Sequence, residues 1–162
     1  MIAGKYFEVI DYTSDVKIKA YGKTMKELFE NSAKGMFFLI SENKEHDLKV
    51  RQEISIFAGY KVSYEDMLLL WLEKLLFYHE TKKILFFDFR INSLFLDNYD
   101  NDKNFCSTPE AGSFLKAEAF GEKINIEKHE ILNHIKGPTY HDLSIIRNSE
   151  RKIFEANIIF DV

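Results

Sequence analysis

Hydrophobic and polar residues alternate along several segments of the chain, and this period of two predicts strands. The predicted strands lie at residues 7–9, 16–20, 50–58, 84–96, 114–120, 140–146 and 152–160. The last two flank a short polar segment, residues 147–151, which has the character of a hairpin turn. We therefore expect the final strand to pair antiparallel with the strand before it.

Two further segments repeat apolar residues every three or four positions, which is typical of helices with one buried face. The first covers residues 24–40 and opens with Thr24 and Glu27 at the spacing of a capping box. The second begins after Ser63, which can cap its first turn, and carries Trp71 in its apolar stripe. The expected fold class is α+β, with two helices packed on a mostly antiparallel sheet.

Chain length and cysteine content indicate how many domains to expect and whether disulfides hold them together. With 162 residues the chain can bury a core of its own, so we expect one domain over residues 1–162. Its one cysteine, Cys106, excludes a disulfide framework. Residues 97–112 are rich in Asn and Asp but lack the glycine and glutamate of an EF-hand, so they are interpreted as a loop insertion.

The charge balance bears on partners and location. A formal net charge of −4 argues against a protein that coats nucleic acid, so RNA is expected to be met only through a partner. The first residues lack the pattern of a signal peptide, and the apolar run at 67–76 is interrupted by Glu73 and Lys74. We expect a cytoplasmic protein that does not insert into membranes.

Acidic residues near both ends of the chain are the first candidates for chemistry. Asp15 follows a polar turn segment, and Asp161 ends an apolar run that stays regular up to the last residues. A packed end would set the carboxylate of Val162 beside Asp161. If the three groups met, their repulsion would favour a hard cation such as Ca²⁺ or Mg²⁺. The alternative is that Asp15 caps a turn, Asp161 is solvated and nothing binds.

A second candidate region surrounds Lys136. Gly137 and Pro138 follow it and prevent a helix, so Lys136 and His141 are expected near the edge or end of a sheet. The lysine is suited to phosphate and the histidine to proton transfer or ligation, while the alternative is that both are ordinary surface residues. The chain has no glycine-rich phosphate loop, serine nucleophile elbow or zinc-binding histidine pair, so an independent enzyme lacks support.

These segments, in this order, resemble the archease family. That family opens with Asp-His-Thr-Ala-Asp, carries Lys-Ala-x-Thr-Tyr-His late in the chain, and finishes with Asp and one apolar residue. The matching residues are Asp11, Thr13, Asp15, Val16, Gly22, Lys136, Thr139, Tyr140, His141, Asp161 and Val162. The stretch 119–122 and His129 also look like family positions. The chain departs from the pattern at Tyr12, Ser14 and the pair Gly137-Pro138.

The resemblance implies a non-catalytic accessory protein of an RtcB-type RNA ligase. Archeases promote guanylylation of the ligase by GTP and its multiple turnover during tRNA splicing or RNA repair. By the same resemblance, Asp15, Asp161 and Val162 would form a divalent-cation site, most often for Ca²⁺, with Mg²⁺ or Mn²⁺ possible. Lys136 matches a lysine important for activation, which would contact phosphate or the partner. The alternative function is a chaperone-like module that binds other proteins.

Overall fold

The computed structural model describes residues 6–11, 14–42, 46–97 and 112–162. The elements in chain order are β1 (Phe7–Asp11), β2 (Val16–Gly22), α1 (Met25–Ile40), β3 (Val50–Gly59), α2 (Tyr64–Lys82), β4 (Ile84–Phe95), β5 (Ser113–Lys123), β6 (Gly137–Asn148) and β7 (Ile153–Asp161). Apart from its two end residues, the insertion expected at 97–112 lies outside the described residues, as do Tyr12 and Cys106.

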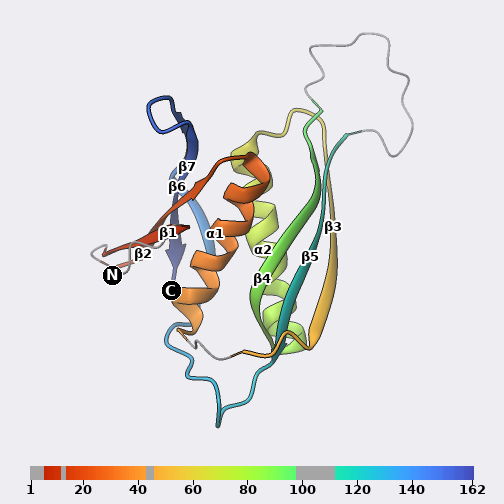
Figure 1. Cartoon of the computed structure of the whole chain (residues 1–162), viewed down its shortest axis with the longest axis vertical. Coiled ribbons are helices and arrows are strands. Elements are labelled where there is room, and N and C mark those ends of the chain that lie inside the picture. The colour runs from red at the N-terminus through yellow and green to blue at the C-terminus, as the bar shows by residue number, and fades with distance from the viewer. Residues whose placement is uncertain (1–5, 12–13, 43–45, 98–111) are drawn as a thin grey trace.

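The strands of the described residues form two antiparallel sheets, one with the order β1-β2-β7-β6 and the other with the order β3-β5-β4. Both helices lie between the sheets, as Figure 1 shows, with α1 packed on β2 and β4 and α2 packed on β6, β4 and β3. The α+β class is confirmed. The strands divide into two sheets, however, whereas the sequence pattern predicts one.

One core joins the two sheets to the helix layer. Its largest fully buried side chains are Trp71, Phe29, Phe86, Phe160, Ile18 and Leu28. The indole N–H of Trp71 donates to the backbone carbonyl of Phe29 at 3.0 Å, so the polar atom of the largest core residue is satisfied and α2 is fixed against α1. Neither of the two helices in the described residues is long and apolar enough to cross a membrane.

Side-chain caps start both helices where the sequence predicted. The hydroxyl of Thr24 accepts from the amide of Glu27 at 3.1 Å, and the carboxylate of Glu27 accepts from the amide of Lys23 at 3.3 Å rather than from that of Thr24. Ser63 and Asp66 form the full reciprocal box at the start of α2, with both hydrogen bonds at 3.0 Å.

Two glycines permit close approaches of the backbone. A Cβ on Gly22, at the end of β2, would collide with the backbone nitrogen of Leu28 in the first turns of α1. A Cβ on Gly121, in the middle strand β5, would collide with the backbone carbonyl of Leu85 in β4. Larger residues would force the helix from the sheet in the first case and the strands apart in the second.

The hairpin of β6 and β7 confirms the antiparallel pairing expected at the end of the chain. β6 begins at Gly137, earlier than the predicted start, because Pro138 is tolerated near the beginning of an edge strand. The register is interrupted between Thr139 and Ser144, so the residues between them bulge from the edge. In this bulge the hydroxyl of Tyr140 donates to the carboxylate of Asp66 at 3.0 Å.

Candidate functional site

One end of the β1-β2-β7-β6 sheet gathers the residues singled out in the sequence. β2 and β7 pair Val16 with Phe160, and extending that antiparallel register by one residue sets Asp15 opposite Asp161. On the other side of β7, Asp161 pairs with Gly137 of β6. The backbone N–H of Lys136 donates to the carbonyl of Asp161 at 2.8 Å. Residues from three distant parts of the chain therefore meet at this sheet end.

Asp15 and Asp161 belong to the outer face of the sheet. Ile18, Ile158 and Phe160 are fully buried on the face that meets the helices. Side chains alternate between the faces of a strand, and directly opposed residues share a face, so the two aspartates project together away from the core. Asp161 is exposed and Asp15 is half-buried.

Two carboxylates opposed in this way would repel each other. Like charges directly opposite each other on one sheet face destabilise the pairing. Within the described residues, neither carboxylate accepts a hydrogen bond from a side chain or joins an ion pair. A hard cation, which prefers oxygen ligands, would relieve the repulsion. The donors at this end are therefore of the type that suits Ca²⁺ or Mg²⁺.

The described side chains alone do not complete a metal site. Over residues 6–11, 14–42, 46–97 and 112–162, no group of three or more His, Cys, Asp or Glu side chains is placed to hold a metal ion. Asp15 and Asp161 supply two carboxylates, and the exposed Val162 follows directly in the chain. The side chain of Asp11 and the adjoining residues 12–13 lie outside the described part.

Lys136 flanks the aspartates but belongs to the opposite side of the sheet. It is exposed and lines a pocket of about 410 Å³ between α2 and the segment that leads into β6. Its ammonium group has no partner among the described residues. His141 lies farther along the edge strand, 3.8 Å from the carboxylate of Asp142 and largely exposed. The backbone of Lys136 is thus held near Asp161, while its side chain lines the pocket beside α2.

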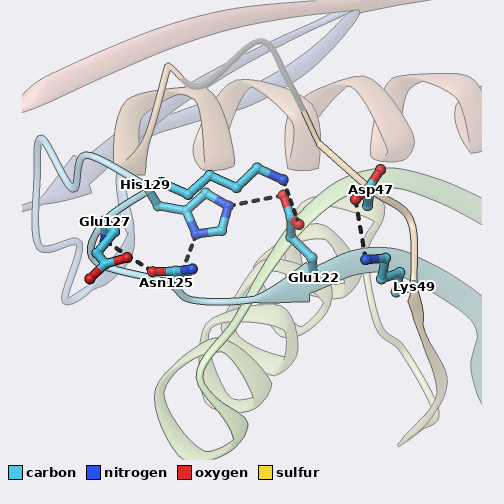
Figure 2. Close-up of polar contacts among 7 residues, drawn as sticks. Asp47, Lys49, Glu122, Asn125, Glu127 and His129 are labelled. Carbon is cyan, nitrogen blue, oxygen red and sulfur yellow. Dashed lines mark hydrogen bonds and ion pairs between the residues drawn. The ribbon is translucent and has the colours of Figure 1, made fainter.

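A buried polar cluster at the end of β5, in the three-stranded sheet, was not predicted. His129 donates from Nε2 to Oε1 of Glu122 at 2.9 Å, and the ammonium of Lys128 donates to Oε2 at 2.9 Å (Figure 2). The backbone N–H of Asn125 donates to Nδ1 of His129 at 2.9 Å. Because Nδ1 accepts, the ring hydrogen is on Nε2, and the tautomer of His129 is fixed.

The cluster holds Glu122 as a carboxylate. Burial by itself raises the pKa of Glu122, but the hydrogen bonds from Lys128 and His129 outweigh it and bring the pKa down to about 2. These bonds hold the segment after β5 against the end of that strand. That segment continues to Lys136 and is also bonded to the end of α1, through the amide of Leu132 and the carbonyl of Ile40 at 2.8 Å.

In the sequence, His129 and the stretch ending at Glu122 stand out only as positions that match a family. Their pairing spans a loop, and neither helical nor strand periodicity relates residues on the two sides of a loop. The sequence feature that could have indicated the pair is a histidine and a carboxylate on the two sides of a short turn that contains Asn125. The side chain of Asn125 accepts from the backbone amide of Glu127 at 3.0 Å in this turn.

Comparison with known proteins supplies the family. Residues 7–162 match the model of the Archease protein family (MTH1598/TM1083). The chain is 34% identical to the protein archease of Sulfolobus acidocaldarius over 142 residues, which cover 88% of this chain and 89% of that protein. It is 32% identical to the protein archease of Methanothermobacter thermautotrophicus over 158 residues, which cover 98% of this chain and 99% of that protein.

A solved structure has the same fold. The solution structure of Methanobacterium thermoautotrophicum protein 1598 superimposes with a TM-score of 0.71 at 27% sequence identity, covering 98% of this chain and 100% of that one. The family match over nearly the whole chain, the curated relatives and the shared fold agree. The chain therefore belongs to the archease family.

Proposed function

We propose that this chain is a non-catalytic activator of an RtcB-type RNA ligase, promoting guanylylation of the ligase by GTP and its repeated turnover in tRNA splicing or RNA repair. Family membership supports this role, and the observation that carries it is the register that sets Asp15 opposite Asp161. The activator works in the cytoplasm and meets RNA only through the ligase, in keeping with its net charge of −4.

In this proposal Asp15, Asp161 and the carboxylate of Val162 hold a divalent cation, Ca²⁺ in the first instance and Mg²⁺ or Mn²⁺ as substitutes. The ion would supply positive charge at an end of the molecule that is otherwise rich in carboxylate oxygens. The two aspartates come from neighbouring strands, so holding the ion also ties the start of β2 to the end of β7. Binding thereby orders the surface that meets the ligase.

Lys136 is proposed to contact phosphate or an acidic group of the ligase. Its exposed ammonium has no described partner, so no existing ion pair must break before it binds. The hydrogen bond from its amide to Asp161 holds the start of its side chain close to the cation ligands. A cation site and a point charge at one sheet end suit recognition of the anionic groups of a nucleotidyl-transfer centre.

The test is GMP attachment to a purified RtcB-type ligase under limiting GTP. We expect stimulation by the wild type, and loss of stimulation in Asp15→Ala and Asp161→Ala with the fold retained. Asp47→Ala is the matched control, because it removes an exposed carboxylate whose one ion pair among the described residues is with Lys49 at 3.3 Å. Full stimulation by both site variants would refute the cation site. Absence of stimulation by the wild type, with a ligase that responds to another archease, would refute the activator role.

A chaperone-like protein-binding function is the second candidate. On the outer face of the β3-β5-β4 sheet, Phe57 and Phe95 both stand opposite Phe114 and are 67% and 50% exposed. Exposed apolar groups of this kind bind other proteins. Suppression of aggregation of unrelated clients, lost in Phe57→Ser and kept in Asp161→Ala, would favour this candidate over ligase activation.

A further inference from the structure

The outer side of α2 carries an apolar stripe of two partly exposed residues, Leu70 and Phe77. Leu70 and Phe77 are seven residues apart, close to two helical turns, which places them along one line of the helix. Leu70 and Phe77 are 36% and 54% exposed. A repeat of seven returns to the same side of a helix, as in the seam through which one helix packs lengthwise against another.

Charges flank the stripe with opposite sign on its two sides. Glu73 and Glu80 lie on the side toward β6, where both line the pocket shared with Lys136. Lys74 lies on the other side, with its ammonium 5.4 Å from the centre of the Phe77 ring. Glu73 has no hydrogen bond or ion pair with any described residue, while Glu80 pairs with His134 at 3.5 Å and with Lys83 at 3.9 Å.

The pocket lies at the end of the stripe nearer Lys136 and has an apolar floor. Leu76 and Ile135 are almost completely buried there, and Phe77 forms part of the wall. A Cβ placed on Gly137 would meet nothing within 4 Å, so the wall opposite the helix stays open. The volume of about 410 Å³ is ample for one large apolar side chain from another molecule.

We propose that this stripe and pocket dock an amphipathic helix of the activated ligase, with apolar residues along its seam and a basic flank. The inference rests on the proposed function and adds the contact surface. Two lysines or arginines of that helix, spaced seven residues apart, would pair with Glu73 and Glu80, which lie about 10 Å apart along the axis of α2. An acidic residue on the other flank would meet Lys74, so the charges fix the rotation of the docked helix.

The experiment titrates the protein against a purified RtcB-type ligase and measures binding and GMP attachment in parallel. For Phe77→Asp and Glu73→Lys we expect the dissociation constant and the half-maximal concentration to rise about tenfold, as for loss of one interface anchor. Maximal stimulation should be unchanged. Asp161→Ala should instead lower maximal stimulation, so docking and activation are read separately.

Two matched controls make the same changes elsewhere. Phe57→Asp changes another exposed phenylalanine, and Glu53→Lys changes an exposed glutamate on β3. Dissociation constants for the stripe variants no higher than those of the controls would overturn the docking surface while leaving the activator role standing. Binding that depends on Phe77, without stimulation by the wild type, would instead refute the activator role alone.

A photo-cross-linking residue at position 77, compared with one at position 57, identifies the occupant. The expected product joins position 77 to a ligase helix that carries Lys or Arg at a spacing of seven. A product between two copies of this chain, or with an extended or acidic segment of the ligase, would overturn the proposal. Equal cross-linking yields from positions 77 and 57 would also overturn it.

Discussion

The backbone amide of Lys136 donates to the backbone carbonyl of Asp161 at 2.8 Å, joining the start of β6 to the end of β7. The bond is independent of either side chain, so both can be replaced without losing it. It places a candidate cation ligand and a candidate phosphate contact in adjacent strands, on opposite faces of the sheet. The two groups can therefore engage different parts of one partner.

Replacement of Lys136 should reduce activation without affecting stability. In Lys136→Ala the exposed ammonium is lost while the backbone bond to Asp161 remains. We expect at least about a tenfold loss of ligase stimulation, on the scale of one charge-assisted contact, and partial recovery in Lys136→Arg. GMP attachment measures the effect. Lys152→Ala, in the turn before β7, is the control, and equal stimulation by the two alanine variants would exclude a role for Lys136.

The aspartate pair should make stability depend on calcium. Ca²⁺ should raise the melting temperature of the wild type, and each kcal/mol of binding free energy corresponds to about 2–4 °C for a chain of this size. In a chelator, Asp161→Asn should be at least as stable as the wild type, because the like-charge repulsion is gone. The variant should not respond to Ca²⁺. Calorimetric scans test this, and an equal response of variant and wild type would exclude the site.

Extension of the chain beyond Val162 gives a separate test of the third proposed ligand. Added residues would convert its carboxylate into an amide and should weaken calcium binding while leaving the β2–β7 register intact. Titration calorimetry with Ca²⁺ compares the extended and unextended proteins. Unchanged affinity would leave Asp15 and Asp161 as candidates and remove Val162.

Loss of His129 should destabilise the segment that leads to Lys136. In His129→Ala the buried carboxylate of Glu122 loses one donor, which costs about 1–3 kcal/mol of unfolding free energy. Urea unfolding measures the loss of unfolding free energy, and we expect ligase stimulation to decrease in the same variant. His134→Ala, at a largely exposed ring, should change the unfolding free energy by less than about 0.5 kcal/mol. Equal effects of the two changes would contradict a structural role for the buried cluster.

Acid should destabilise the fold through Glu122. Its pKa of about 2 in the folded protein lies below the ordinary value of 4.5, so the unfolded chain binds its proton first as the pH falls. The contribution is fully present above pH 4.5 and is lost as the pH falls through 4.5 toward 2. Unfolding free energies measured across this range should decline less steeply in Glu122→Gln than in the wild type. An equal dependence of the unfolding free energy on pH in Glu122→Gln and the wild type would refute this role of Glu122. Glu127→Gln, at an exposed glutamate, is the reference variant.

Gly121→Ala should destabilise the three-stranded sheet. The added methyl would collide with the backbone carbonyl of Leu85 in β4. The collision can be relieved only if β5 moves away from β4. We expect a loss of about 1–3 kcal/mol in urea unfolding. Gly137→Ala provides the comparison because its methyl would meet nothing within 4 Å. Similar stabilities of the two variants would show that the strands can yield at Gly121.

Local patterns determined the elements whose signals lie within a few residues. Thr24 and Ser63 mark the helix starts because a cap needs only a hydroxyl and an amide three residues on. The polar segment 147–151 likewise predicts the β6–β7 hairpin from neighbouring residues alone, and the structure places the turn at 149–152. The motif residues Asp15, Lys136 and Asp161 were also identifiable from the sequence, through a resemblance spread along the chain.

Tertiary structure decided which of these elements are neighbours. Alternation assigns faces to a strand but not partners, so the order β1-β2-β7-β6, the division into two sheets and the apposition of Asp15 and Asp161 depend on long-range pairing. The Glu122–His129 bond crosses a loop in the same way. In α2, apolar residues occur on most sides of the helix, so only packing between two sheets reveals that Leu70 and Phe77 remain exposed while Trp71 is buried.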